Sequence, residues 1–119
     1  MKATIAAAAA AMMFSGAAMA ENPMDLANKF GGDCHVCHAI DHKVVGPAWN
    51  DVSARYNAEI KAGKATEKQI EDQLVAKVTK GGKGNWDAVT GGMSMVPHPV
   101  KPTQAQLHEI VKAILALKK

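Results

Sequence analysis

The stretch that decides the fold is residues 34–38, which read Cys34-His35-Val36-Cys37-His38. This Cys-x-x-Cys-His spacing is the attachment motif of c-type haem. Each thiol can add to one haem vinyl group, and the imidazole that follows directly can then bind the iron. The motif therefore predicts one haem c per chain, held covalently by Cys34 and Cys37 and ligated by His38.

Other uses of a cysteine pair fit this sequence less well. A disulfide between residues three apart would close a very small loop and restrain the unfolded chain little. A thioredoxin-like redox pair belongs beside a βαβ pattern, and the chain shows none. A zinc site would need further well-spaced ligands, but the chain has only two cysteines. We therefore favour haem attachment.

The first twenty residues have the pattern of an export signal. Lys2 supplies a positive start, an apolar run covers residues 5–14, and Ala18-Met19-Ala20 is an A-x-A cleavage pattern. The apolar run is shorter than the roughly 18 to 20 residues that a membrane-spanning helix needs. We predict a cleaved signal peptide over residues 1–20, a domain over residues 21–119, and a periplasmic location.

Composition narrows the class of protein further. Residues 21–119 suffice for one small domain, which has a high surface-to-volume ratio. Only four aromatic residues follow the predicted signal, namely Phe30, Trp49, Tyr56 and Trp86. A large apolar cofactor inside the domain would supply much of the apolar core that so few aromatic side chains cannot fill. The net charge is +3 without a dense basic stripe, which gives no indication of nucleic-acid binding.

The spacing of apolar residues predicts an all-α fold. No segment alternates apolar and polar residues over the length of a strand. Asn22-Pro23 has the form of a cap followed by a first-turn proline, and it predicts a helix that runs to Phe30 and ends at Gly31-Gly32. Residues 39–47 are expected to form a loop, and residues 50–56 a short helix.

Two capping boxes predict the remaining helices. Thr66 with Gln69, and Thr103 with Gln106, each precede apolar residues at helical intervals. The first of these helices is expected to end at Gly81-Gly82. Between that point and Pro102 the chain is rich in glycine and proline and longer than an ordinary connection, which points to a functional loop.

The sixth iron ligand is expected in this loop. Methionine sulfur favours ferrous iron and raises the reduction potential. Met95 is our first candidate, because the prolines that follow it can hold a rigid strap across the haem. Met93 and His98 are the alternatives, since either could reach the iron.

Several segments together resemble the short bacterial class I cytochromes c. They are Cys34-His35-Val36-Cys37-His38-Ala39-Ile40-Asp41, Lys43-Val44-Val45-Gly46-Pro47-Ala48-Trp49, Asp51-Val52, Arg55-Tyr56, Gly84-Asn85-Trp86, and Met95 through Pro99. The resemblance implies a small cytochrome c fold, with three to five helices wrapped around the haem. It also implies that the Pro47 carbonyl accepts a hydrogen bond from His38, that Trp49 packs near the buried haem edge, and that Trp86 donates to a haem propionate.

The same resemblance implies a one-electron carrier rather than an enzyme. Its partners would be periplasmic or membrane-bound redox proteins, such as a cytochrome complex, a terminal oxidase or a reductase. We expect no small-molecule substrate, no nucleic-acid partner and a monomeric state. Two alternatives stay open: a haem enzyme or gas or redox sensor with an open distal site, and a subunit fixed permanently in a larger complex.

Overall fold

The computed structural model describes residues 21–119, so the predicted signal peptide over residues 1–20 lies outside the described residues. Within the described part of the chain, no helix combines the length and the apolar character that crossing a membrane requires.

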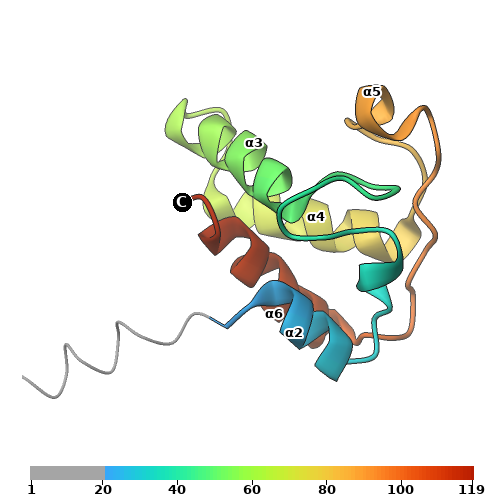
Figure 1. The fold of residues 1–119 in the computed structure, drawn as a ribbon. Coiled ribbons are helices and arrows are strands. Elements are labelled where there is room, and N and C mark those ends of the chain that lie inside the picture. The colour runs from blue at the N-terminus through green and yellow to red at the C-terminus, as the bar shows by residue number, and fades with distance from the viewer. Residues whose placement is uncertain (1–20) are drawn as a thin grey trace, which may run out of the picture.

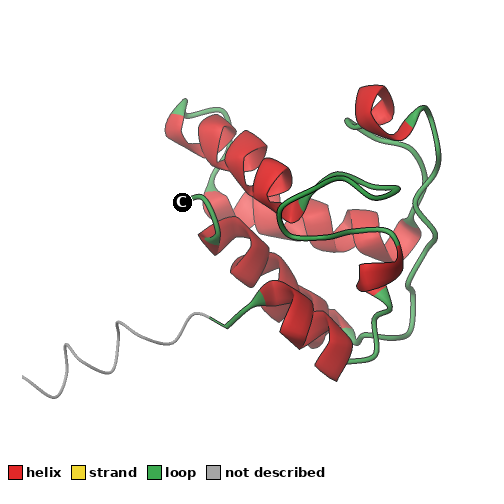
Figure 2. Ribbon diagram, in the orientation of Figure 1, coloured by secondary structure: helices red, strands yellow, loops and turns green. Residues whose placement is uncertain are grey.

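Helices form all of the regular structure in residues 21–119, as Figure 2 shows, and the all-α prediction is confirmed. Two isolated bridges, His38 with Lys43 and Gly82 with Met95, are the exceptions to helix and loop. In chain order the elements are α2 (Pro23–Lys29), the short 3-10 helix η2 (Cys34–Val36), α3 (Trp49–Lys61), α4 (Glu67–Lys80), α5 (Asp87–Thr90) and α6 (Gln104–Ala116).

The predicted helix starts are confirmed by the capping contacts. The Asn22 side chain accepts hydrogen bonds from the backbone N–H groups of Met24, at 2.8 Å, and Asp25, at 3.1 Å. Thr66 and Thr103 both form complete capping boxes at the starts of α4 and α6. Each box satisfies backbone donors that the helix itself leaves without partners.

Two parts of the secondary structure differ from the prediction. α3 runs over Trp49–Lys61 and is longer than the expected residues 50–56. Beyond Tyr56 the apolar pattern is weak, because the buried residue of that part of the helix is the polar Asn57. α5 is a four-residue helix within the Gly/Pro-rich stretch, at a place where the sequence predicted only loop.

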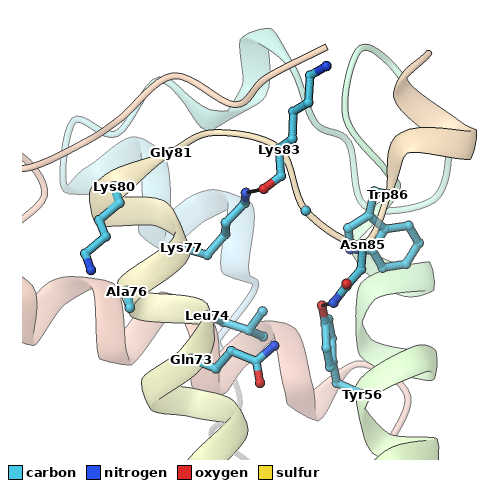
Figure 3. A pocket seen from close by; sticks show the side chains of 11 residues that line it. Tyr56, Gln73, Leu74, Ala76, Lys77, Lys80, Gly81, Lys83, Asn85 and Trp86 are labelled. Carbon is cyan, nitrogen blue, oxygen red and sulfur yellow. Dashed lines mark hydrogen bonds between the residues drawn. The ribbon is translucent and has the colours of Figure 1, made fainter. Parts of the chain in front are cut away.

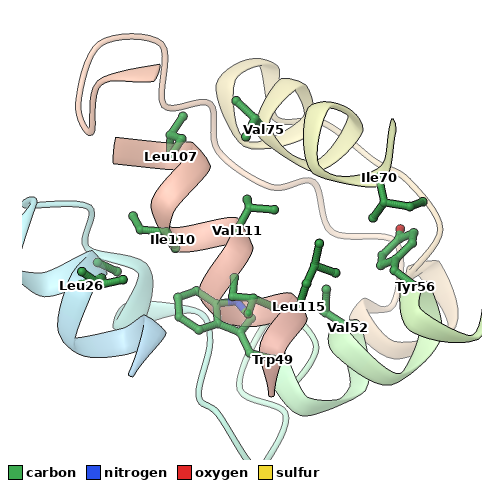
Figure 4. Close-up of a cluster of buried hydrophobic side chains, with 12 residues drawn as sticks. Leu26, Trp49, Val52, Tyr56, Ile70, Val75, Leu107, Ile110, Val111 and Leu115 are labelled. Carbon is green, nitrogen blue, oxygen red and sulfur yellow. The ribbon is translucent and has the colours of Figure 1, made fainter. Parts of the chain in front are cut away.

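α6 is the centre of the fold and packs against α2, α3 and α4 (Figure 1). Its apolar stripe is buried against these three helices. Figure 4 shows part of the resulting core, whose buried members are Leu26, Ala27, Trp49, Val52, Tyr56, Ile70, Val75, Leu107, Ile110, Val111, Ile114 and Leu115.

A buried polar contact fixes the end of α6 on α3. The Ser53 hydroxyl and the Asn57 amide both donate to the Leu115 carbonyl, at 3.0 and 2.8 Å. The Lys118 backbone N–H in turn donates to the Ser53 hydroxyl oxygen at 2.9 Å. These bonds satisfy a carbonyl that the helix end would otherwise leave without a partner. They therefore explain why Ser53 and Asn57 are buried although they are polar.

Candidate functional site

A cavity of about 550 Å³ opens between the helices. Residues from almost every element line it, and the lining is largely apolar, as is usual for a cofactor site. The apolar walls come from α3, α4 and α6, and they consist of Trp49, Val52, Leu74, Val78, Leu107, Ile110, Val111 and Ile114.

The Cys-x-x-Cys-His motif forms one edge of this cavity. η2 coils the motif tightly, so that the backbone N–H groups of Cys37 and His38 both donate to the Cys34 carbonyl, at 3.2 and 2.9 Å. Cys34, Cys37 and His38 all line the cavity. The two cysteines are half-buried and are not joined to each other. Burial raises the pKa of the Cys34 thiol to about 11, which keeps this group protonated at neutral pH.

The orientation of the His38 ring is fixed by the loop that follows. Its Nδ1 lies 2.8 Å from the Pro47 carbonyl oxygen, which can only accept a hydrogen bond, so Nδ1 carries the proton. Nε2 is then the nitrogen with a free lone pair. Burial lowers the pKa of His38, partly opposed by the bond to Pro47, and so favours the neutral imidazole that a metal requires.

Gly46 has a role that the sequence reasoning did not assign. A Cβ atom at this position would lie 2.5 Å from His38 Cε1, so the backbone can approach the imidazole only without a side chain. The Gly46 N–H also donates to the Cys37 carbonyl at 2.7 Å. The ring of the buried Trp49 also lies near the imidazole, with its centre 5.7 Å from that of His38.

Residues 93–98 form a strap that also lines the cavity and is attached to the end of α4. The Met95 N–H donates to the Gly82 carbonyl at 3.1 Å, and the Gly82 N–H donates back to the Met95 carbonyl at 2.8 Å. A third bond runs from the His98 N–H to the Val78 carbonyl at 2.9 Å. The backbone at Met95 is therefore held in place by non-local contacts.

Gly81 makes this attachment sterically feasible. Its φ of +69° is in the region that favours glycine, and a Cβ atom there would lie 2.5 Å from the Met95 carbonyl oxygen. Lys77 completes the turn, because its Nζ donates to the Gly82 carbonyl at 2.7 Å. It also donates to the Lys83 carbonyl, as Figure 3 shows. The sequence predicted Gly81 as a helix end but contained no local signal for its contact with the strap.

All three candidates for the sixth ligand line the cavity. Met95 is half-buried, whereas Met93 is 60% exposed. His98 is also half-buried, and its Nδ1 lies 3.1 Å from the Val96 carbonyl. The structure thus brings Met93, Met95 and His98 to the same cavity as His38. Among them, Met95 has the paired backbone bonds to Gly82, just after α4, and His98 has a single backbone bond to Val78 of α4.

Trp86 lines the cavity from the loop between α4 and α5. It also borders a smaller pocket of about 370 Å³, which is lined in addition by Tyr56, Lys77 and Asn85 (Figure 3). Every residue that the sequence singled out for the cofactor therefore borders the large cavity, including Pro47. An apolar cavity with two adjacent thiols and a neutral, oriented imidazole fits a covalently attached haem.

A helical domain that encloses such a cavity beside a Cys-x-x-Cys-His motif defines the class of c-type cytochromes. No protein-family model matches the chain. It is 38% identical to cytochrome c-551 of Allochromatium vinosum, over 90% of this chain and 96% of that protein. It is 32% identical to cytochrome c-552 of Nitrosomonas europaea, over 93% and 91% of the two chains.

The fold of this chain is also similar to that of a solved structure. Wild-type Nitrosomonas europaea cytochrome c552 superposes with a TM-score of 0.61 and 34% identity, over 80% of this chain and 99% of that one. The chain therefore belongs to the small class I c-type cytochromes, and its all-α cytochrome c fold is confirmed. As a member of this family it is an electron-transfer protein with one covalently bound haem c.

Proposed function

We propose that this protein carries single electrons through a six-coordinate haem iron, with His38 as the fifth ligand and Met95 as the sixth. The observation that carries the proposal is the strap: Met95 lines the same cavity as His38, and paired hydrogen bonds join its backbone to Gly82. The haem, when bound, supplies an iron that alternates between the ferric and ferrous states. Ligands held rigidly through both states need little rearrangement when an electron arrives or leaves.

The other residues of the proposal support the haem and its fixed ligand. Cys34 and Cys37 hold the haem by thioether bonds. Pro47 orients the His38 ring and increases its basicity as a ligand, because its carbonyl accepts the Nδ1 proton. Trp49 packs beside His38 at the buried edge. Trp86, in the loop between α4 and α5, would donate to a haem propionate.

The absorption spectrum of the purified protein tests this proposal. We expect a low-spin spectrum in both oxidation states, with a sulfur-to-iron charge-transfer band in the oxidised form. Both features follow from six-coordinate iron with a thioether ligand. A high-spin oxidised spectrum would contradict the proposal and favour a haem enzyme or sensor with an open distal site.

We further propose that the protein works in the periplasm as a monomer and meets its redox partners only transiently. These partners are periplasmic or membrane-bound redox proteins. The haem-containing protein in a native periplasmic extract is then expected to begin at Glu21 by mass spectrometry. In size-exclusion chromatography it should elute at the size of a single domain. Co-elution with a larger complex would show instead that it is a fixed subunit.

A further inference from the structure

Arg55, on α3, contacts the loop that carries Trp86. Its Nη1 donates to the Asn85 carbonyl at 3.0 Å, and its guanidinium carbon lies 5.1 Å from the centre of the Trp86 ring. Trp86 lines the haem cavity, whereas Arg55 does not. The guanidinium therefore contacts the indole from outside the cavity.

The next residue of α3 holds the same loop. The Tyr56 hydroxyl oxygen accepts a hydrogen bond from the Asn85 side-chain amide at 3.2 Å, as Figure 3 shows. Tyr56 is buried, so this contact is anchored in the core. The chain before Asn85 contains three glycines, which give it little stiffness of its own. Contacts with α3 therefore help to fix the position of Trp86, together with the bonds from Lys77 of α4 to the Gly82 and Lys83 carbonyls.

Arginine suits this position better than lysine does. A planar guanidinium can stack on an aromatic ring and donate a hydrogen bond at the same time, whereas an ammonium group is a compact point charge. Arg55 Nε also lies 3.7 Å from Glu59 Oε2, one helical turn further along α3. This neighbour helps to keep the guanidinium over the loop.

We propose that Arg55 is a positioning residue: it holds the Trp86 indole against the edge of the haem and thereby raises the reduction potential. The proposal rests on the contact between Trp86 and the haem stated above. A fixed indole N–H stabilises the charge of the group it donates to, and a less negative haem edge favours the reduced iron. The guanidinium adds a positive charge on the same side of the cavity, which acts in the same direction.

A double-mutant cycle on the reduction potential separates two effects of Arg55, namely positioning of the Trp86 indole and the positive charge of the guanidinium itself. Arg55→Lys keeps the charge but loses the planar guanidinium. In a protein with Trp86, we expect it to lower the ratio of reduced to oxidised protein by about threefold at fixed ambient potential. This is roughly 30 mV for a one-electron couple. In a Trp86→Phe background, the same substitution is expected to have no measurable effect.

Lys61→Gln is the matched control, because it removes a positive charge from the last turn of the same helix. It should leave the potential near that of the unaltered protein in both backgrounds. Equal shifts from Arg55→Lys with and without Trp86, or no shift in either, would overturn the proposal. Failure of the proposed electron-carrier site would be visible separately, as loss of the sulfur-to-iron band in the unaltered protein.

Discussion

Replacing both Cys34 and Cys37 with alanine is expected to abolish haem attachment and leave the chain largely unfolded. The cavity that these residues border measures about 550 Å³. Without the haem, the largely apolar lining of this cavity would be exposed to water, at roughly 25 cal/mol per Å² of apolar surface. A whole domain is stable by only roughly 5–15 kcal/mol, so a loss of this kind is large. The helices therefore cannot keep their arrangement around the cavity without its occupant.

Haem staining after denaturing electrophoresis measures the covalent attachment, and far-ultraviolet circular dichroism measures the helix content. Val36→Ala is the matched control, since Val36 lies between the two cysteines and is 61% exposed. It should retain both the haem stain and the helical spectrum. Haem that remains bound to the double alanine variant through denaturing electrophoresis would contradict the attachment by these thiols.

Local signals were sufficient to predict where most helices begin. Asn22, Thr66 and Thr103 cap their helices through side-chain bonds to residues two or three positions away, so a short window of sequence contains the whole interaction. The end of α3 is different. Its polar residue Asn57 is buried because it donates to Leu115, which lies far along the chain, and no local pattern encodes such a contact.

The two sides of the candidate site also differ in whether local sequence patterns could predict them. The motif at residues 34–38 contains both thiols and the histidine, so its chemistry could be predicted from five adjacent residues. The strap depends on long-range contacts. Gly81 looks like an ordinary helix terminator in the sequence, yet its lack of a side chain is what allows the strap backbone to approach. Arg55 likewise contacts the Trp86 ring only because the fold brings α3 beside the loop that carries Trp86, and no local pattern encodes this contact.

Replacing Met95 with alanine is expected to remove the sulfur-to-iron charge-transfer band and to lower the reduction potential on the order of 0.2 V. Axial ligands span a range of about 0.8 V, and a lost thioether no longer favours ferrous iron. Absorption spectroscopy and a redox titration measure the two effects. Met93→Leu and His98→Gln should change both much less. If Met93→Leu alone loses the band, Met93 is the ligand and our assignment is wrong.

The same ligation is expected to depend on how the strap is attached to α4. Gly81→Ala places a Cβ atom 2.5 Å from the Met95 carbonyl oxygen and 2.7 Å from the Pro97 nitrogen, so the strap must move away from the helix end. The band should therefore weaken or disappear although Met95 is intact. Gly82→Ala is a matched control: φ is +90° there, but a Cβ atom meets nothing within 4 Å. Because it introduces only backbone strain, it should cost about 1–2 kcal/mol of stability and retain the band. An intact band in both variants would show that the paired bonds between Gly82 and Met95 do not hold the ligand in place.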